Sequence, residues 1–317
     1  MLNSTQQQSN TYADMRHALD EVKGKSADYS WLWNECRGTE PVYVAFERLR
    51  KHVDPDRPYF FGELSNGIRF AADARDFPAA LHALYPRCNS ILINGLIENV
   101  GEQAGDVIDV GANIGVVAAS LGRHLGTRGH VYSFEPSPTT FLVAAATIAL
   151  NGIENVTLTQ AAIGDTVGDI PFQMTPGNSA IASAVKHNFP FLNEWQEIVV
   201  PCQTLDSFLG ATPSRKVLLI KIDVEGFELN VIRGARETIR KFMPTIVYEY
   251  TPIAATATGL TEAESIALLS AVGHFRFEAL LEPSIDDLPT QVQRVPFPLP
   301  EGLQNQVNVF AVPVENP

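Results

Sequence analysis

The sequence predicts an α/β fold in which parallel strands are joined by crossover helices. In the stretch "DVIDVGANIGVVAASLG", residues 106–122, an apolar strand runs directly into a glycine-rich turn and then into a helix. Strand-like and helix-like segments go on alternating after it, and the alternation returns from residue 216 onward. This pattern is typical of parallel sheets, because a crossover, usually a helix, must carry the chain back before the next parallel strand starts.

Composition favours a small-molecule partner. The chain has 317 residues, of which 45% are hydrophobic and 19% charged, and its net charge is −13. Because no run of Lys or Arg offsets this charge, we expect no binding to nucleic acid or to an anionic membrane. The length fits one full-size domain with an extension. Homo-oligomerisation remains open.

Cysteine usage and hydropathy indicate a soluble protein of the cytoplasm. The 3 cysteines lie far apart and form no Cys-x-x-Cys pair, which disfavours a disulfide framework and a zinc site. No apolar run reaches the roughly 18 residues of a membrane span. The polar start of the chain has no apolar signal core.

An N-terminal extension of helices and a hairpin is expected over residues 1–89, ahead of the main domain at 90–317. The first dozen or so residues are polar, and we expect them to be disordered. In "YFFGELSNGIRFAAD", residues 59–73, two apolar runs flank Asn66 and Gly67, which predicts a hairpin. Helices of the extension are expected at Tyr12–Lys23 and Glu40–His52.

The main domain is expected to alternate strands with helices. Strands are predicted at 106–110, 129–135, 155–164, 216–225 and 245–250, and helices at about 113–125, 138–150, 228–242 and 261–273. The helix at 261–273 opens with a capping box of Thr261 and Glu264. Two more strands within 169–208 are expected to form an insertion. The last apolar segments, 275–281 and 306–313, have no helix between them, so we expect them to pair antiparallel.

The glycine spacing at the first turn discriminates between two nucleotide-like ligands. A nicotinamide site has the pattern G-x-G-x-x-G, whose middle glycine makes room for a pyrophosphate. Counted from Gly111, that position is Asn113, which argues against a dinucleotide. An acid at the strand end, Asp109, suits a ligand with a cationic amino-acid end. The next strand ends at Glu135, whose carboxylate can accept hydrogen bonds from both ribose hydroxyls.

A series of segments carries a family resemblance. "VIDVGANIG", "VYSFEPSP", "ALNGIENV", "AAIGD", "QTLDSF" and "LLIKIDVEGFE" occur in this order. Together they closely resemble the FkbM-type S-adenosylmethionine-dependent methyltransferases, over about residues 90–313. The resemblance implies a seven-stranded Rossmann-like methyltransferase sheet with an antiparallel last strand. It also implies S-adenosyl-L-methionine as cofactor and O-methylation of a hydroxyl on a sugar or a polyketide-like secondary metabolite.

The resemblance further implies a cofactor site at the ends of successive strands. Its residues are Asp109, Gly111, Ala112, Asn113, Gly115, Glu135, Pro136, Ala161, Ala162, Ile163 and Asp223. By this resemblance the methionine part of the cofactor would be surrounded by Asp109, Gly111, Asn113 and Gly115. Glu135 would hold the ribose, and Ala162 with its neighbours would lie at the edge of the adenine.

The candidate catalytic residues lie in "KIDVEGFE" and at the end of the following strand. Lys221, Asp223 and Glu225 alternate along the predicted strand and therefore share one face. Charges on an apolar strand are costly unless they pair or face a site. Methyl transfer to a hydroxyl needs an aligned acceptor and a group that takes its proton. We expect these three residues and Glu249 to supply the chemistry.

Several alternatives remain open at this stage. Lys221 and one acid can form a purely structural ion pair, and Glu225 and Glu228 can serve as helix N-terminal acids. The acids can also hold a divalent cation, although we favour a site without metal because Lys221 would repel one. His187, in a predicted lid, is a further candidate base. N- or C-methylation on the same fold and a non-catalytic cofactor-binding partner subunit are the alternative functions.

Overall fold

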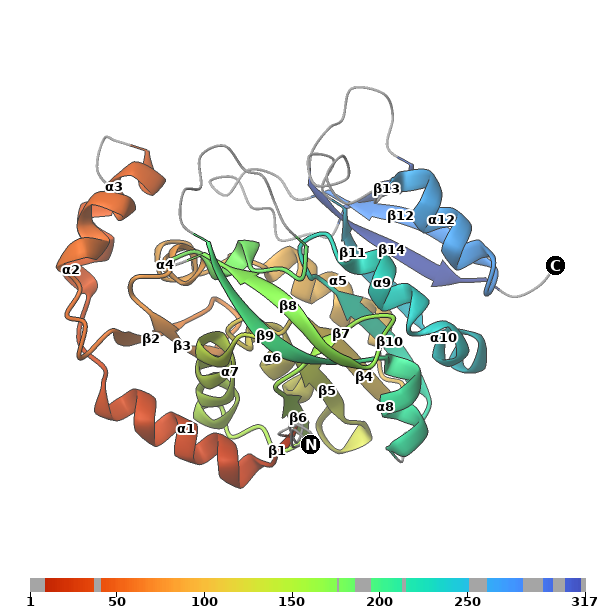
Figure 1. Ribbon diagram of the computed structural model, residues 1–317, viewed down its shortest axis with the longest axis horizontal. Helices are drawn as coiled ribbons and strands as arrows, with labels where there is room; N and C mark the ends of the chain where they lie inside the picture. The colour runs from red at the N-terminus through yellow and green to blue at the C-terminus, as the bar shows by residue number, and fades with distance from the viewer. Residues whose placement is uncertain are drawn as a thin grey trace.

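A mixed sheet forms the centre of the molecule in the computed structural model (Figure 1). The structure describes residues 9–36, 41–175, 177–185, 195–212, 215–250, 261–281, 293–298 and 306–314. Within these ranges the sheet has nine strands in the order β1-β6-β5-β4-β10-β11-β14-β12-β13. Their bounds in that order are Ser9–Asn10, Val156–Thr159, Val131–Phe134, Asp106–Val110, Val217–Ile222, Thr245–Tyr250, Val307–Pro313, Phe275–Leu280 and Arg294–Pro296.

The strands from β6 to β11 run parallel, and β14 runs antiparallel to both of its neighbours, β11 and β12. The predicted antiparallel pairing of the last two apolar segments is therefore confirmed. We expected seven strands and the sheet has nine. The two edge strands, β1 and β13, are short additions, and β1 also corrects the expectation of disorder up to residue 12, because Ser9 and Asn10 pair with β6.

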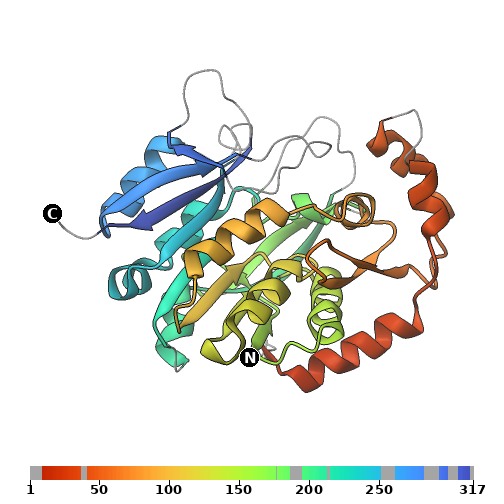
Figure 2. The same cartoon turned by 180° about the vertical axis from the view of Figure 1, so that it is seen from behind.

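Helices cover both faces of the sheet, as Figure 2 shows from behind. One apolar core lies between the sheet and helices α5, α6 and α7, and a second lies between the sheet and α8, α9, α10 and α12. The bounds of the first group are Ser90–Val100, Val116–Leu125 and Pro138–Leu150, and those of the second are Leu205–Ala211, Glu228–Arg233, Arg236–Phe242 and Glu262–Ser270. All five residues of β4 are buried, as expected for a central parallel strand.

The N-terminal extension consists of helices and the predicted hairpin. Its elements are α1 (Tyr12–Gly24), α2 (Ser30–Cys36), α3 (Val42–Leu49), β2 (Tyr59–Glu63), β3 (Arg69–Asp73) and α4 (Phe77–Leu84). β2 and β3 pair antiparallel around Asn66 and Gly67, which confirms the hairpin. The backbone N–H of Ala71 donates to the hydroxyl of Thr147 in α7, and both belong to the same packed layer.

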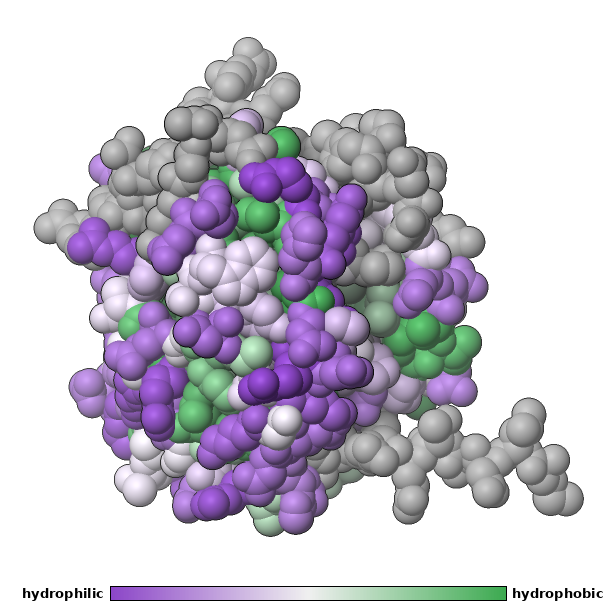
Figure 3. Space-filling model, turned by 90° about the vertical axis from the view of Figure 1, so that its left-hand side faces the viewer, coloured by the Kyte–Doolittle hydropathy of each residue, from purple (hydrophilic) through white to green (hydrophobic). Residues whose placement is uncertain are grey.

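The extension and the main domain share an apolar core. Side chains such as Met15 of α1 and Phe70 of the hairpin lie in the cluster that includes residues of α6 and α7. The boundary at residue 90 stays a prediction, but the residues on its two sides pack together. The outer face of the extension is predominantly hydrophilic (Figure 3).

Two predicted elements are interrupted in the structure. Residues 155–164 form β6 and then the separate strand β7 (Ala162–Ile163). The predicted helix at 228–242 breaks into α9 and α10 because the chain at Gly234 passes against Gly164, where a Cβ would lie 1.9 Å from the carbonyl oxygen. Asp206 then accepts from the backbone N–H groups of Glu237 and Thr238 at the start of α10.

The predicted insertion is a small sheet of its own. β7 pairs parallel with β9 (Gln196–Gln203), which pairs antiparallel with β8 (Gly168–Met174). The two extra strands predicted within 169–208 are therefore confirmed. The capping box of Thr261 is also present, since its hydroxyl accepts from the backbone N–H of Glu264. In the part of the chain that the structure describes, no helix is long and apolar enough to cross a membrane.

Candidate functional site

A cavity of about 300 Å³ lies at the carboxyl ends of β4, β5 and β10. After β4 the chain builds the sheet outward through β5 and β6, and it later returns to the other side of β4 with β10. Open α/β sheets bind ligands at such a switch point. Nine of the predicted cofactor residues line the cavity: Gly111, Ala112, Asn113, Glu135, Pro136, Ala161, Ala162, Ile163 and Asp223. Asp109 and Gly115 are absent from the lining and lie behind it.

The glycine turn follows β4, and its shape comes from close backbone contacts. Gly111 has φ +84°, and a Cβ there would lie 1.9 Å from the carbonyl oxygen of Asp223. Gly115 has φ +83° and lies against the backbone of Ala144 in α7. Positive φ at Asn113 as well delays the helix, so α6 begins at Val116 rather than at about 113. Gly111 is thus required by the close approach of two loops, and it also lines the cavity, as predicted for a cofactor residue.

Substitution of Gly111 by Ala is expected to destabilise the fold by roughly 1–3 kcal/mol. Both the positive φ and the overpacking against Asp223 contribute to this cost. Urea unfolding measures it, with Gly24→Ala as control, because nothing lies within 4 Å of a Cβ at Gly24. Equal stability of Gly111→Ala and Gly24→Ala would contradict a close approach of Gly111 to the carbonyl oxygen of Asp223.

A buried ion-pair network lies beneath the turn. The ammonium of Lys221 is 3.4 Å from Asp109 Oδ1 and 3.3 Å from Asp223 Oδ2. It also donates to the carbonyl of Gly111 at 2.7 Å. Asp109 accepts from the hydroxyl of Ser133, and it is 0% exposed. Asp109 therefore holds Lys221 in place instead of contacting a ligand, which corrects its predicted role.

The charge state of Lys221 follows from these contacts. Burial lowers its pKa, but the carboxylates of Asp223 and Asp109 outweigh burial, so the pKa is raised above the ordinary lysine value. The ammonium is protonated and fully engaged by its partners. The ion pair that was one alternative for Lys221 is thus present, and it involves two acids in place of one.

Glu135 connects the glycine turn to the start of α7. Its Oε2 accepts from the backbone N–H of Asn113 at 2.9 Å, and its Oε1 accepts from that of Ser137 at 3.0 Å. The side chain is buried and lines the cavity, and burial raises the pKa of its carboxyl to about 7. Each carboxylate oxygen keeps a second lone pair for a ligand.

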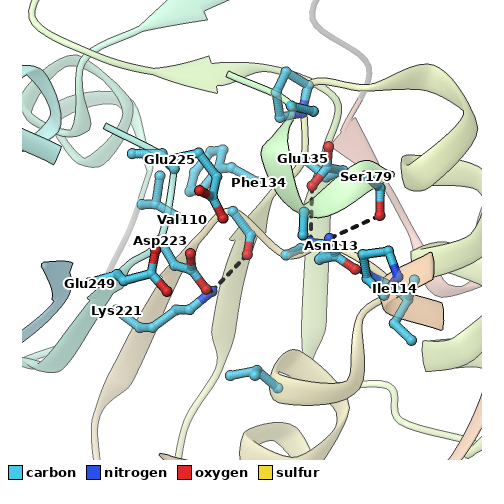
Figure 4. Close-up of a pocket in the computed structure, with 18 of the residues that line it drawn as sticks. Val110, Asn113, Ile114, Phe134, Glu135, Ser179, Lys221, Asp223, Glu225 and Glu249 are labelled. Atoms are coloured by element: carbon cyan, nitrogen blue, oxygen red, sulfur yellow. Dashed lines mark hydrogen bonds and ion pairs between the residues drawn. The ribbon is translucent and has the colours of Figure 1, made fainter. Parts of the chain in front are cut away.

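Three carboxyl groups gather on the opposite side of the cavity (Figure 4). One oxygen each of Asp223, Glu225 and Glu249 lies within 4.8 Å of the others. β10 ends at Ile222, so Asp223 and Glu225 occupy the turn after it, which corrects the prediction that they alternate along a strand. The turn is shaped by Glu228, whose Oε1 accepts from the backbone N–H groups of Val224 and Gly226.

Two carboxyl groups of this cluster, those of Glu225 and Glu249, have raised pKa values. Burial raises the pKa of Glu225 well above its ordinary value, and the neighbouring Glu249 adds to the effect. Burial likewise raises the pKa of Glu249, with Asp223 adding to it, while the side-chain amide of Gln306 donates to Glu249. Glu225 also adopts φ 54°, a conformation that is costly for a residue with a side chain and is often found at functional sites. The cluster can therefore exchange a proton or hold a cation.

Other parts of the cavity wall were not predicted from sequence. The N-terminal extension and the start of α5 contribute Pro78, Leu81, His82, Cys88, Asn89 and Leu92, and the insertion contributes Phe172, Ser179, Ala180, Ala182 and Ala184. Most of these residues are small or apolar and belong to no motif. Their place in the cavity wall therefore becomes visible only in the folded chain. His82 is buried, and its Nδ1 is hydrogen-bonded to the carbonyl of Pro78. His187 and the middle of the predicted lid lie outside the described residues.

Comparisons with known proteins match the chain to methyltransferases. A family model described as "Methyltransferase FkbM domain" matches residues 109–277. The chain is 28% identical over 180 residues to "Methyltransferase 1" of Beauveria bassiana (strain ARSEF 2860), a match that covers 51% of this chain and 72% of the relative. It is 26% identical over 146 residues to "2-O-methyltransferase NoeI" of Sinorhizobium fredii (strain NBRC 101917 / NGR234), covering 43% and 59%.

Among solved structures, a methyltransferase FkbM from Methylobacillus flagellatus KT is similar at a TM-score of 0.44 and 14% identity. That match covers 93% of this chain and 58% of the other. The matched regions thus span less than two thirds of this solved chain and of the Sinorhizobium relative.

Proposed function

Because the chain belongs to the methyltransferase FkbM family, we propose that it transfers a methyl group from S-adenosyl-L-methionine to a hydroxyl of a sugar or polyketide-like molecule. The observation that carries the proposal is the lining of the cavity at the switch point. Among the residues that line it, Glu135, Asp223, Glu225 and Glu249 carry four carboxyl groups, and Lys221 carries one ammonium. Such an acidic lining suits a cationic ligand.

The residues present fit this cofactor. Its sulfonium and amino groups are positive, and the carboxylates of the cavity attract such charges. When bound, the cofactor supplies an electrophilic methyl group whose leaving group is a neutral thioether. Glu135 would hold the ribose, and the apolar residues Ala161, Ala162 and Ile163 would lie along the adenine. Gly111 and Asn113 would contact the amino-acid end.

Glu225 is the residue that we propose as proton acceptor for the hydroxyl. A carboxylate whose pKa is raised is a stronger base than an ordinary one, and burial together with Glu249 raises the pKa of Glu225 well above its ordinary value. The carboxylate of Asp223 is engaged by the ammonium of Lys221 at 3.3 Å, which leaves it a weaker candidate. Glu249 would share the proton with Glu225 and orient the acceptor. Lys221 would act as a support for the turn.

A hydroxyl acceptor is supported by the carboxyl cluster and by one relative. Two neighbouring carboxyl groups can take up a hydroxyl proton without a metal ion. The Sinorhizobium relative carries the name 2-O-methyltransferase. The same acids could hold a divalent cation, but the ammonium of Lys221 beside Asp223 opposes one, so we propose a site without an obligatory metal.

Labelled methyl transfer tests the proposed function. Purified protein is incubated with methyl-labelled cofactor and fractionated small-molecule extracts, with and without EDTA, and the product is identified by mass spectrometry. We expect label on a hydroxyl oxygen and equal rates in both conditions. Label on nitrogen or carbon would overturn the O-methylation proposal, and full loss of activity in EDTA that added Mg²⁺ restores would overturn the metal-free one.

Cofactor affinity is expected to fall as the pH decreases through about 7. The carboxylate of Glu135 must be ionised to accept from the ribose hydroxyls, and burial raises its pKa to about 7. From pH 8 to pH 6 the ionised fraction falls by about tenfold, so the Kd for S-adenosylhomocysteine should rise by about as much. Calorimetry at both pH values measures it.

The control for this pH dependence is Glu135→Gln. Its Kd at pH 8 should be raised by about tenfold or more, since each 1.4 kcal/mol is a factor of about ten, and it should change little between the two pH values. A wild-type Kd that is the same at pH 6 and pH 8 would rule out Glu135 as the ribose ligand.

A further inference from the structure

The segment 177–185 spans the cavity between the N-terminal extension and the turn after β10. At one end the carbonyl of Gly177 accepts from the backbone N–H of Phe77, the first residue of α4. At the other end the hydroxyl of Ser183 donates to the carbonyl of Glu225 at 2.7 Å. The short helix η3 (Ser179–Ile181) lies between these ends, beside α4. Ser179 and three alanines of the segment line the cavity.

Asp76 fixes this segment to the extension. Its Oδ1 accepts from the backbone N–H of Ser179 at 2.7 Å, and its Oδ2 accepts from the hydroxyl of Ser179 at 2.7 Å. Both distances are short, as expected for hydrogen bonds to a carboxylate. The two bonds together fix the position of Ser179 and the direction of its hydroxyl proton.

The hydroxyl of Ser179 in turn orients Asn113 in the glycine turn. The side-chain amide of Asn113 donates to Ser179 Oγ at 3.3 Å, as Figure 4 shows. A serine hydroxyl has one proton and two lone pairs. Because its proton is directed to Asp76, its lone pairs are left for Asn113. Asn113 is also held by Glu135, which accepts from its backbone N–H.

We propose that Asp76 and Ser179 are positioning residues that make the N-terminal extension a part of the cofactor site. They act through the side-chain amide of Asn113, whose nitrogen loses its acceptor without Ser179 and has a less fixed acceptor without Asp76, while its Oδ1 still accepts from the backbone N–H of Ile114 at 2.8 Å. The inference rests on the proposed function, since it assigns the cavity to S-adenosylmethionine. It gives residues before 90 a role in cofactor affinity, beyond their packing against α7.

A mutant cycle with S-adenosylhomocysteine as probe tests the inference. Calorimetry is carried out on wild type, Asp76→Ala, Ser179→Ala and the double variant, and thermal unfolding is recorded for each. We expect each single variant to raise the Kd by about tenfold. The Kd of the double variant should be no higher than that of the single variant with the higher Kd, because the effects of coupled residues in one network are not additive. Asp76→Asn, which keeps one acceptor oxygen, should lie between wild type and Asp76→Ala.

Asp73→Asn is the matched control. Asp73 lies three residues before Asp76 in the N-terminal extension and pairs with Arg75 through both carboxylate oxygens. The substitution therefore removes a nearby charge that does not contact Ser179. Its Kd should equal that of wild type. A lowered unfolding temperature in Asp76→Ala with an unchanged Kd, or additive effects in the double variant, would overturn the inference while leaving the proposed function intact. Absence of binding by wild type would overturn both.

Discussion

Replacement of Glu225 by Gln is expected to lower the rate of methyl transfer by about 10²–10⁴ while leaving cofactor affinity nearly unchanged. Loss of a general base costs about this factor, which corresponds to roughly 3–5 kcal/mol of barrier at about 1.36 kcal/mol per tenfold. The carboxyl of Glu225 lies in the cluster with Asp223 and Glu249, on the side of the cavity opposite Glu135. The acceptor would be placed there, beyond the methyl group.

Single-turnover kinetics with saturating cofactor measure the rate, and calorimetry with S-adenosylhomocysteine measures the affinity. Glu237→Gln is the matched control, because this carboxylate is exposed on α10 and its salt bridge to Arg240 lies outside the cavity. Asp223→Asn should lose less activity than Glu225→Gln. Full activity of Glu225→Gln would remove this residue from the chemistry, and a larger loss in Asp223→Asn would transfer the role to Asp223.

Replacement of Lys221 by Met is expected to destabilise the protein by about 3–5 kcal/mol. Removal of one partner from a buried ion pair leaves the other charge uncompensated, which is strongly destabilising. Lys221 is 2% exposed, and Asp109, 3.4 Å away, is fully buried. The variant also loses the hydrogen bond to Gly111 that fixes the turn. Urea denaturation gives the change in the free energy of unfolding.

Two companion variants separate charge burial from a general effect of losing lysine. Lys216→Met removes an exposed lysine just before β10 and should change stability by less than about 0.5 kcal/mol. Asp109→Asn combined with Lys221→Met removes both buried charges and should recover a good part of the loss. If the double variant is as unstable as Lys221→Met, uncompensated charge at Asp109 is not the cause.

The strands that carry the cavity could be predicted from sequence because their signal is local. β4 has the predicted bounds, 106–110, since five consecutive residues are buried between two helix layers and are mainly apolar. The glycine turn and Glu135 could be predicted as parts of the site because each comes at the end of such a strand. The family motifs fall in the same places, so local pattern and resemblance indicated one site.

The remaining features depend on contacts between distant segments. The break at Gly234 exists because Gly164 passes against it, and no pattern within 228–242 encodes that contact. α4 and the start of α5 form part of the cavity wall, but their nearly continuous apolar sequence gives no periodic signal. The role of Asp109 was mistaken for a similar reason, because its partner Lys221 is 112 residues away and the pairing needs the adjacent strands β4 and β10.

We infer that this cavity binds S-adenosylmethionine rather than a nicotinamide dinucleotide, and calorimetric titration of the wild-type protein distinguishes the two ligands. Separate titrations with S-adenosylhomocysteine and with NADH are carried out at pH 8, where the carboxylate of Glu135 is mostly ionised. We expect saturable one-site binding of S-adenosylhomocysteine and no binding of NADH. Tighter binding of NADH than of S-adenosylhomocysteine would contradict it.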